Sequence, residues 1–301
     1  MTSLPGSLAE LYPFSPRRLA LPAGEMSYLD EGPADAPVLV CVHGNPTWSF
    51  YWRRLAQALA GRMRVIVPDH IGCGLSDKPT SGFDYRLASH TDNLRRLLDH
   101  LEVERASFAV HDWGGAIGFG LCAREPERAE RLLVTNTAAF PSPRIPTSIA
   151  SGRIPGFGAL AIRGLNLFAR VATWRATAKG LSEEVKAGLL FPYDSWDHRI
   201  AVHRFVQDIP MSPAHPSWST LEETARRLDA LVEHEMLILW GDDDFCFDVS
   251  FRKEWQARFP KAECHAWADV GHYVMEDAPE RVLERAVPFF LGERDATARS
   301  A

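Results

Sequence analysis

The chain has 301 residues, with 33 Lys and Arg residues against 39 Asp and Glu residues and a formal net charge of −6. Its hydrophobic share of 46% and charged share of 24% are those of a globular protein, which excludes disorder as the main state. No basic run stands out and no stretch approaches about 18 uninterrupted apolar residues, so we expect neither a nucleic-acid binder nor a membrane-spanning protein.

The N-terminal residues and the cysteines predict a cytoplasmic protein. The first 14 residues, MTSLPGSLAELYPF, lack the basic start and apolar run of a secretory signal. The five cysteines are widely scattered and include no C-x-x-C pair. We therefore expect buried thiols in a reducing compartment, with neither a disulfide framework nor a zinc site.

Short apolar runs that end at turn residues predict six buried strands. They are residues 38–42, 65–67, 108–110, 132–135, 236–240 and 264–267. Between them, apolar residues recur three and four positions apart, notably over 87–101 and 281–291, which predicts amphipathic helices. Strands that are apolar along their whole length and alternate with helices are typical of an α/β fold, with a mostly parallel sheet covered by helices on both faces.

The alternation stops between about residues 140 and 221. This stretch is rich in proline, tryptophan and phenylalanine, and it has helical fragments but no strand pattern. A disordered loop of this length would contain few aromatic residues, so we expect a helical cap inserted into the sheet domain. The predicted division is a first part of the core over 1–140, a cap over 141–220 and a second part of the core over 221–301.

A sharp strand-to-helix turn follows the third predicted strand. It reads His111-Asp112-Trp113-Gly114-Gly115, with glycines where close backbone approach leaves no room for a side chain. Asp112 stands where Ser stands in the G-x-S-x-G nucleophile elbow, facing the N-terminus of a helix. The partial positive charge there favours the ionised carboxylate, which makes Asp112 a candidate nucleophile. The alternative is an aspartate that only caps the helix, and the turn alone does not decide between the two.

The loop after the first predicted strand, from His43 to Trp48, is the candidate anion-binding element. Its bend allows backbone N–H groups to point into a site together with the N–H of Trp113. The Asn45 amide and the Trp113 indole add side-chain N–H donors, which suit a weakly basic anion such as a halide or a carboxylate. The alternative for this loop is a plain turn.

The last two predicted strands are followed by an acidic run and by a histidine. Asp242, Asp243 and Asp244 follow the first of them, and His272 follows the second. One carboxylate that orients His272 as a base would complete a triad in the chain order nucleophile, acid, histidine. A solvated acidic turn and a structural histidine are the alternatives, but the four strand-end signals together favour catalysis. No G-x-G-x-x-G motif is present, so we expect no dinucleotide, and the sequence indicates no other cofactor and no metal.

The segments His43-Gly44-Asn45-Pro46-Thr47-Trp48-Ser49 and Val110-His111-Asp112-Trp113-Gly114-Gly115 resemble the haloalkane dehalogenase branch of the α/β-hydrolases. The resemblance covers essentially the whole chain. It implies an α/β-hydrolase fold, with Asp112 as nucleophile and His272 as base. It also implies that Asn45 and Trp113 bind the leaving anion.

The same resemblance implies which carboxylate is the acid. One dehalogenase subgroup carries a Glu after the strand that follows the nucleophile helix, where this chain has Asn136. The acid implied here is therefore Asp244, in the pattern Trp240-Gly241-x-x-Asp244.

Four further segments resemble a narrower group, the β-lactone decarboxylases of bacterial long-chain olefin biosynthesis. The segments are 68–72, 135–141, 208–214 and 246–248. Because the match includes part of the cap, where substrate is selected, it implies decarboxylation of cis-3,4-dialkyl-β-lactones to cis-alkenes, with haloalkane dehalogenation as the alternative. Long-chain substrates imply a membrane surface or a partner that delivers them, and the pathway implies a complex with its other enzymes.

Two other functions are weaker expectations. Epoxide hydrolases also use an aspartate nucleophile, but they protonate the epoxide oxygen with cap tyrosines, and the predicted cap has one tyrosine, Tyr193. A binding protein that kept the fold and lost the chemistry is the second. The intact set of nucleophile, acid and histidine argues against it.

Overall fold

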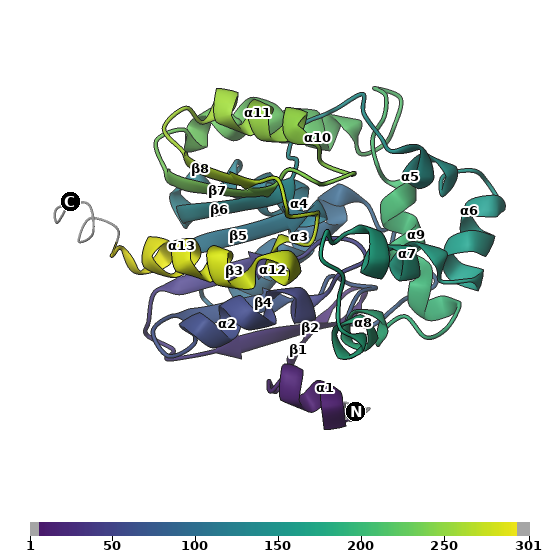
Figure 1. Cartoon of the computed structure of the whole chain (residues 1–301), viewed down its shortest axis with the longest axis horizontal. Helices are drawn as coiled ribbons and strands as arrows, with labels where there is room; N and C mark the ends of the chain where they lie inside the picture. Colours follow the sequence, from purple (N-terminus) through teal and green to yellow (C-terminus); the bar gives the residue numbers. More distant parts are fainter. Residues whose placement is uncertain (1–5, 294–301) are drawn as a thin grey trace.

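An eight-stranded sheet forms the centre of the computed structural model, which describes residues 6–293 (Figure 1). Its strands are β1 Arg17–Leu21, β2 Gly24–Glu31, β3 Val38–Val42, β4 Arg64–Pro68, β5 Ala106–Asp112, β6 Ala129–Thr137, β7 Glu235–Gly241 and β8 Glu263–Trp267. Their order in the sheet is β1-β2-β4-β3-β5-β6-β7-β8. All pairings from β4 to β8 are parallel, so the six predicted strands and the mostly parallel α/β sheet are confirmed.

The antiparallel hairpin of β1 and β2 is not among the predicted strands. It extends the sheet at one edge, where β2 pairs antiparallel with β4. The residues of β1, Arg-Arg-Leu-Ala-Leu, are exposed or half-buried along the whole strand. A strand of this kind has no continuous apolar run, which is the signal that identified the others.

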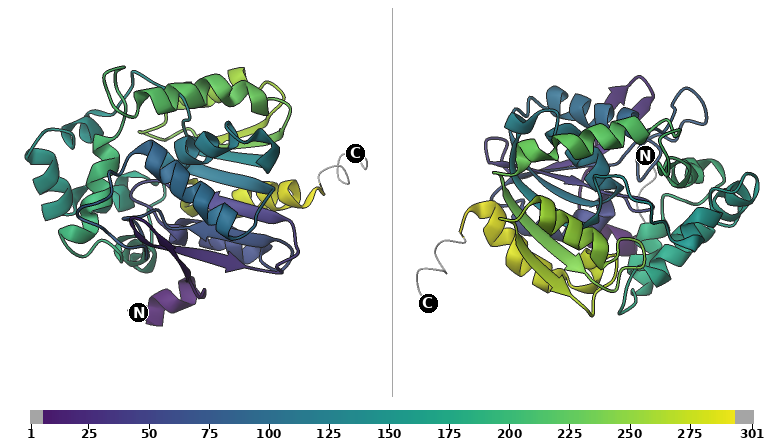
Figure 2. Two further views of the ribbon diagram at one scale, coloured as in Figure 1. Left: turned by 180° about the vertical axis from the view of Figure 1, so that it is seen from behind. Right: turned by 90° about the horizontal axis from the view of Figure 1, so that it is seen from above.

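Helices cover both faces of the sheet and form two separate hydrophobic cores (Figures 1 and 2). On one face lie α2 Arg53–Leu59, α12 Val274–Asp277 and α13 Pro279–Leu291. On the other face lie α3 Leu87–His100, α4 Trp113–Cys122, α10 Trp218–Arg227 and α11 Val249–Arg258. The helices predicted over 87–101 and 281–291 are thus confirmed as α3 and α13.

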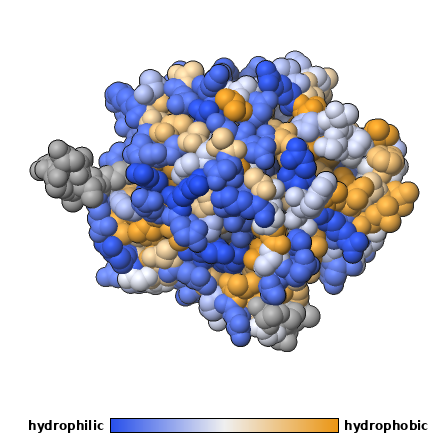
Figure 3. Space-filling model, in the orientation of Figure 1, coloured by the Kyte–Doolittle hydropathy of each residue, from blue (hydrophilic) through white to orange (hydrophobic). Residues whose placement is uncertain are grey.

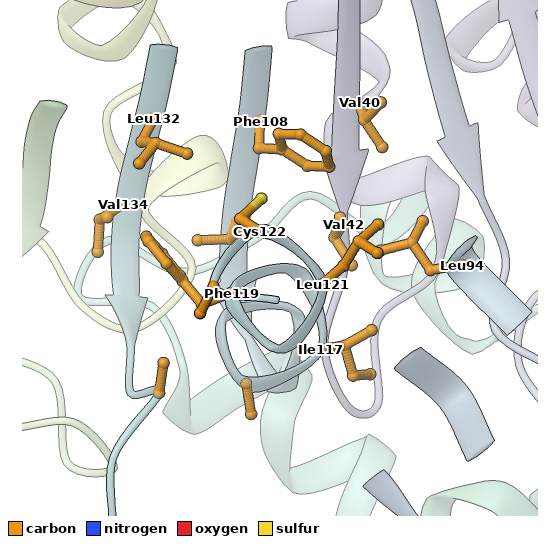
Figure 4. Close-up of a cluster of buried hydrophobic side chains, with 14 of the residues drawn as sticks. Val40, Val42, Leu94, Phe108, Ile117, Phe119, Leu121, Cys122, Leu132 and Val134 are labelled. Atoms are coloured by element: carbon orange, nitrogen blue, oxygen red, sulfur yellow. The ribbon is translucent and has the colours of Figure 1, made fainter. Parts of the chain in front are cut away.

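Helix α4 lies at the middle of the second core, directly behind the turn that contains Asp112. Apolar side chains of α4 pack against residues of three adjacent strands and of α3 (Figure 4). Those labelled in the figure are Val40, Val42, Leu94, Phe108, Ile117, Phe119, Leu121, Cys122, Leu132 and Val134. Because α4 is buried along almost its whole length, the start of the helix is held rigidly under the site.

The chain between β6 and β7 contains helices and no strand in the described structure. Its elements are α5 Thr147–Ser151, α6 Phe157–Ala159, the π-helical turn η3 Leu160–Gly164, α7 Leu167–Arg175, α8 Glu183–Leu190, the 3-10 turn η4 Asp197–Arg199, α9 Ile200–Gln207, α10 and the 3-10 turn η5 Leu228–Leu231. All but α10 and η5 gather at the end of the molecule to which the parallel strands point (Figure 1). The remaining short elements are α1 Gly6–Leu11, η1 Ser49–Trp52 and η2 Pro126–Arg128.

The predicted cap boundary at residue 220 lies inside helix α10. This helix packs on α3 and α4 of the core, so it belongs to the layer over the sheet. We propose that the cap runs from about residue 141 to just before Trp218. The proline-rich sequence before α10 does not mark this transition, because prolines occur throughout the cap.

The loop after β3 fastens the cap to the core by three hydrogen bonds. The side-chain N–H groups of Asn45 and Trp48 donate to the carbonyls of Val202 and Gly188, at 3.2 and 3.0 Å. In return, the Tyr193 hydroxyl of the cap donates to the Thr47 carbonyl at 3.2 Å. None of the described helices is both long and apolar enough to cross a bilayer.

Candidate active site

Asp112 lies at the carboxyl end of β5, where the chain turns sharply into α4. Its φ of 51° is in the left-handed region, which side chains rarely adopt and which is found at functional turns. The turn fits only because its neighbours are small. A Cβ on Gly44 would overlap the Asp112 carboxylate, and one on Gly114 would overlap the Val42 carbonyl.

The Asp112 carboxylate is buried and held by backbone donors. The backbone N–H of Asn45 donates to Asp112 Oδ1 at 2.6 Å, and that of Trp113 also stabilises the carboxylate. His272 Nε2 lies 3.6 Å from Asp112 Oδ2. Burial raises the pKa of Asp112 above its ordinary value, while His272 and the two N–H groups partly offset this effect. The two N–H groups expected to form an anion hole thus already hold the candidate nucleophile.

His272 follows β8 and lies between two carboxylates. Its Nδ1–H donates to Asp244 Oδ2 at 2.8 Å, which leaves Nε2 directed at Asp112. Burial opposes protonation of the ring, but Asp244 and then Asp112 outweigh it, so the pKa of His272 is raised above its usual 6.5. The structure thus brings the predicted nucleophile, histidine and acid together, with a hydrogen bond from His272 to Asp244 and an ion-pair contact from His272 to Asp112.

The three adjacent aspartates after β7 have three different environments. Asp242 forms an ion pair with Arg252, and Asp243 is exposed to solvent. Only Asp244 is buried and bonded to His272. The structure therefore distinguishes Asp244 from its two neighbours, a choice that the acidic run by itself left open.

Asn136, at the end of β6, is a site residue to which the sequence assigned no role. Its Nδ2 donates to Asp244 Oδ2 at 2.8 Å and to the Gly241 carbonyl at 2.9 Å, while its Oδ1 accepts from Gly241 N. The side chain thus fixes both the acid and the strand end that carries it. The signal that pointed to this position was its equivalence to the acid position of a dehalogenase subgroup.

Two further side chains position His272. His111 Nε2 donates to the His272 carbonyl at 2.9 Å, and the ring of Phe247 stacks on the imidazole at 5.7 Å. His111 precedes Asp112 in the turn, and the structure places it in the core next to the site. Its effect on His272 passes through the backbone, which no sequence spacing specifies.

Asn45 and Trp113 both offer donors to a ligand beside Asp112. The Trp113 indole N–H has no acceptor among the described residues, and the ring lines the same cavity as Asp112. The Asn45 amide gives one of its two N–H groups to Val202, which leaves the second for a ligand. Neutral N–H donors at this place suit a weakly basic anion better than a strongly basic one.

A cavity opens above Asp112, between the core and the cap. Its wall is almost entirely apolar and includes Phe140, Ile149, Phe168 and Phe247. Cys246 and Arg144 are among its few polar members, whereas Tyr193 is fully buried, bonded to Thr47, and does not line it. The one tyrosine of the predicted cap is therefore not in place to protonate an epoxide oxygen.

A second apolar pocket lies behind the first in the cap. It is formed mainly by α5, η3 and α7, and it shares Ile149 and Phe168 with the cavity above Asp112. Phe157 of α6 and Phe245, two residues before Phe247, also line it. The two apolar spaces are thus neighbours that share one wall, and one of them contains the candidate nucleophile.

No group of three or more metal-ligating side chains is assembled within residues 6–293. The five cysteines all lie in this part of the chain and none is in a disulfide. The geometry therefore contains a buried carboxylate, a histidine, a second carboxylate bonded to it and N–H donors, beside an apolar cavity. This set is suited to displacing an anion from carbon.

Comparisons with known proteins agree with this architecture. Residues 37–279 match the family model described as the alpha/beta hydrolase fold. The cis-3-alkyl-4-alkyloxetan-2-one decarboxylase of Xanthomonas campestris is 45% identical over 93% of this chain and 97% of its own length. The protein with the same name from Shewanella oneidensis is 40% identical over 97% and 92%.

Haloalkane dehalogenases are similar at greater distance. Haloalkane dehalogenase 2 of Mycobacterium bovis is 30% identical over 93% of this chain and 96% of its own. The crystal structure of a haloalkane dehalogenase from Bradyrhizobium elkani superposes with a TM-score of 0.84 at 26% identity, covering 94% of this chain and 99% of that one. The chain therefore belongs to the α/β-hydrolase fold family, in the group that contains these decarboxylases and the haloalkane dehalogenases.

Proposed function

We propose that the protein is a β-lactone decarboxylase that converts cis-3,4-dialkyl-β-lactones to cis-alkenes and CO2. The observation that carries this proposal is a pair of adjacent apolar pockets that share Ile149 and Phe168, the first of which contains Asp112. A dialkyl lactone has two alkyl groups on adjacent carbons, so its ring at Asp112 would place one chain in each pocket. The identity of 45% and 40% to decarboxylases of that substrate class supports the same reaction.

The proposed reaction begins with attack of the Asp112 carboxylate on the ring carbon that bears the ring oxygen. The C–O bond of the strained ring breaks with inversion, and an alkyl ester of Asp112 forms together with a free carboxylate. The indole N–H of Trp113 and the second amide N–H of Asn45 receive this carboxylate. The arrangement requires no metal to stabilise the released anion.

Elimination completes the cycle. The C–C bond to the carboxylate breaks, CO2 leaves, and the electron pair forms the alkene while the ester C–O bond breaks and regenerates the Asp112 carboxylate. Inversion followed by anti elimination converts a cis-lactone to a cis-alkene. The rival route, attack at the ring carbonyl, forms an anhydride with Asp112. A trans-alkene from pure cis-lactone would contradict the first route.

Dehalogenation is the second candidate, because the N–H donors that suit a carboxylate also suit a halide. In that reaction His272 must activate water to hydrolyse the alkyl-aspartyl ester. Esterification removes the negative charge of Asp112, which is one of the causes of the raised pKa of His272. The imidazole would then lose its proton more readily and act as a base.

A parallel assay of the purified protein separates the two reactions. One sample receives a cis-3,4-dialkyl-β-lactone and is analysed for alkene, and the other receives bromo- and iodoalkanes and is analysed for halide. We expect rapid alkene formation and slow halide release. Asp112→Asn should lower both by at least about 10⁴-fold, because the nucleophile is lost. An inert lactone with fast halide release would make dehalogenation the function.

His272→Gln distinguishes the mechanisms within one protein. The lactone route uses no water, so its loss should be smaller than the roughly 10²–10⁴-fold that removal of a general base costs. With a haloalkane, the same variant should release one halide per enzyme and then stop, with the alkyl group retained on Asp112 as an added mass. Accumulation of a lactone-derived ester in this variant would show that the lactone route is also hydrolytic.

We further propose a cytoplasmic location and a complex with other enzymes of the olefin pathway. Five cysteines without a disulfide fit a reducing compartment. A β-lactone with two long chains is nearly insoluble in water, so direct transfer between enzymes would be an advantage.

A further inference from the structure

The large hydrophobic side chains that the described structure leaves exposed all lie between residues 154 and 196. Six of them belong to α6, η3, α7 and the adjoining residues, which we call the outer cap face: Ile154, Phe157, Leu160, Leu165, Leu167 and Trp174. Trp174 is the most exposed, at 72%. In Figure 3, hydrophobic surface gathers at the edge of the molecule that α6 occupies in Figure 1. Single exposed apolar residues are normal, but a concentration of this kind marks a binding surface.

Helix α7 contributes an ordered part of this surface. Leu167, Arg170, Val171 and Trp174 occupy positions i, i+3, i+4 and i+7, so they lie on one side of the helix. Leu167, Arg170 and Trp174 are exposed, and Val171 is half-buried. A side that combines leucine, tryptophan and arginine is typical of helices that lie at a membrane–water interface.

The charge of this segment is opposite to that of the whole chain. Residues 141–182 contain five Arg and one Lys but no Asp or Glu, in a protein whose formal net charge is −6. Arg144, Arg163 and Lys179 form ion pairs with acidic residues from elsewhere. The guanidinium groups of Arg170 and Arg175 form no ion pair with any described residue. They therefore remain available for anions outside the protein.

The outer cap face is also continuous with the second pocket. Phe157 and Leu167 line that pocket and are exposed at the surface. The pocket in turn shares Ile149 and Phe168 with the cavity that contains Asp112. The second pocket thus lies between the basic surface and the cavity of the candidate nucleophile, with Ile149 and Phe168 as the shared wall. An apolar pocket that opens on a basic surface suits a ligand that arrives from an apolar phase with anionic headgroups, which a lipid bilayer provides.

We infer that the outer cap face binds the surface of an anionic lipid bilayer. Trp174, Phe157 and the leucines insert at the level of the headgroups, while Arg170 and Arg175 contact lipid phosphates. The orientation places the second pocket against the acyl chains. This inference does not rest on the proposed function, because it holds for any apolar substrate of the site.

Vesicle co-sedimentation of the full chain tests the inference. The vesicles consist of phosphatidylcholine alone or of phosphatidylcholine mixed with phosphatidylglycerol. We expect binding to the mixed vesicles that weakens with added salt, and little binding to phosphatidylcholine alone. Failure to bind the mixed vesicles, or equal binding to both kinds, would overturn the inference.

Matched variants locate the surface. Arg170→Glu combined with Arg175→Glu should lower the partition coefficient about tenfold or more, and Trp174→Ser should lower it by a similar factor. The control is Arg62→Glu combined with Arg105→Glu, two exposed arginines near the amino ends of the strands. The control should bind like the original protein, and an equal loss in it would contradict the assignment.

Two further measurements distinguish a loss of vesicle binding from a loss of folding or activity. Circular dichroism and thermal unfolding confirm that each variant is folded, and turnover of a short-chain lactone without vesicles shows that the site is intact. Normal short-chain turnover without vesicle binding would overturn the lipid inference and leave the proposed function standing. Self-association that Trp174→Ser abolishes, without vesicle binding, would instead assign this face to a second copy of the chain.

Discussion

The three aspartates after β7 have the same side chain, but only Asp244 is placed to orient His272. In the original protein the Asp244 carboxylate accepts a hydrogen bond from His272 Nδ1–H, and its charge raises the pKa of the ring. Asp244→Asn removes this carboxylate. We expect hydrolysis of an alkyl-enzyme ester to fall by about 10³–10⁴-fold, while lactone decarboxylation falls much less, because only the hydrolysis needs the base.

The matched control for this variant is Asp243→Asn, which changes an exposed carboxylate of the same turn. It should leave both reactions unchanged. An NMR titration of His272 provides a readout that a purely structural defect would not produce, namely a lower pKa in Asp244→Asn alone. An unchanged pKa would contradict the role of Asp244.

Most of the candidate site was predictable because its residues follow strands. Parallel strands deliver their carboxyl ends to one edge, so Asp112, His272, Asn45 and Trp113 could be grouped without a structure. Asp244 was separable from its two neighbours only through a family resemblance, since all three have the same chemistry. The role of Asn136 was not predictable, because it depends on hydrogen bonds between the ends of two strands.

At the scale of elements, the loop between β8 and α13 is anchored by a buried ion pair. Arg53 of α2 and Glu276 of α12 are each 2% exposed, and the Arg53 guanidinium also donates to the Phe50 carbonyl and stacks on its ring. Glu276→Gln leaves the arginine buried with a weaker partner. We expect the free energy of unfolding in urea to fall by about 3 kcal/mol.

The control for this stability prediction is Glu293→Gln. Glu293 also pairs with an arginine, Arg62, but both side chains are about half exposed. An exposed pair contributes roughly 0–1 kcal/mol, so this change should be small. Equal losses in the two variants would mean that burial of the Arg53 pair adds nothing.

Helix α7 gives a prediction about chain length. Val171 lines the second pocket, and Val171→Trp should fill it. If this pocket holds one of the two alkyl chains, turnover of a lactone with two long chains should fall at least about tenfold, while a lactone with one short chain keeps its rate.

Arg170→Trp introduces the same side chain one position earlier, outside the pocket, and should not change this chain-length preference. The ratio of kcat/KM for the two lactones is the measurement. A uniform loss for both lengths in Val171→Trp would place the second chain elsewhere.

The elements differ in how far the sequence specified them. Continuous apolar strands and the helices α3 and α13 were predictable because burial on both sides, or on one stripe, leaves a regular pattern. The edge strand β1 has no such pattern, since one side of an edge strand faces solvent, and Ser27 interrupts the apolar run in the buried middle of β2. The change from cap to core at α10 was not predictable, because a helix that packs in the cap and a helix that packs on the sheet have equally apolar inner sides.

For the molecule as a whole, buried histidines determine the response to acid. The histidines whose pKa burial lowers are His43, His70, His90, His111 and His203, with values of about 4 for His70 and His203. The unfolded chain binds these protons near pH 6.5 and the folded one does not, so their contribution to stability is present above pH 6.5 and is lost as the pH falls. Asp69 and Asp112 act in the opposite direction over this range, since burial raises their pKa values. The raised pKa of His272 acts only above pH 6.5, where the folded chain keeps this proton and the unfolded chain loses it.

The five lowered groups outnumber the two raised carboxylates, so we expect the free energy of unfolding to fall from pH 6.5 toward pH 4. His90→Phe should make this dependence less steep by about 1.4 kcal/mol per pH unit, because one proton no longer binds on unfolding. Neither ring nitrogen of His90 has a partner, and the ring stacks on Phe205 at 4.6 Å, so phenylalanine suits the site.

His100→Phe is the control, on the same helix but exposed to solvent. Urea unfolding at several pH values measures both variants. Parallel curves for His90→Phe and the original protein would show that His90 is not among the groups that titrate on unfolding.

The fastening of the cap has a consequence for motion. Asn45 bonds through its side chain to Val202 in α9 and through its backbone N–H to the Asp112 carboxylate. One residue thus transmits displacement of the cap to the nucleophile. A displacement of the cap that pulls on this loop would draw the Asn45 N–H away from the Asp112 carboxylate. The position of the cap and the hydrogen bonding of the candidate nucleophile are therefore linked through one residue.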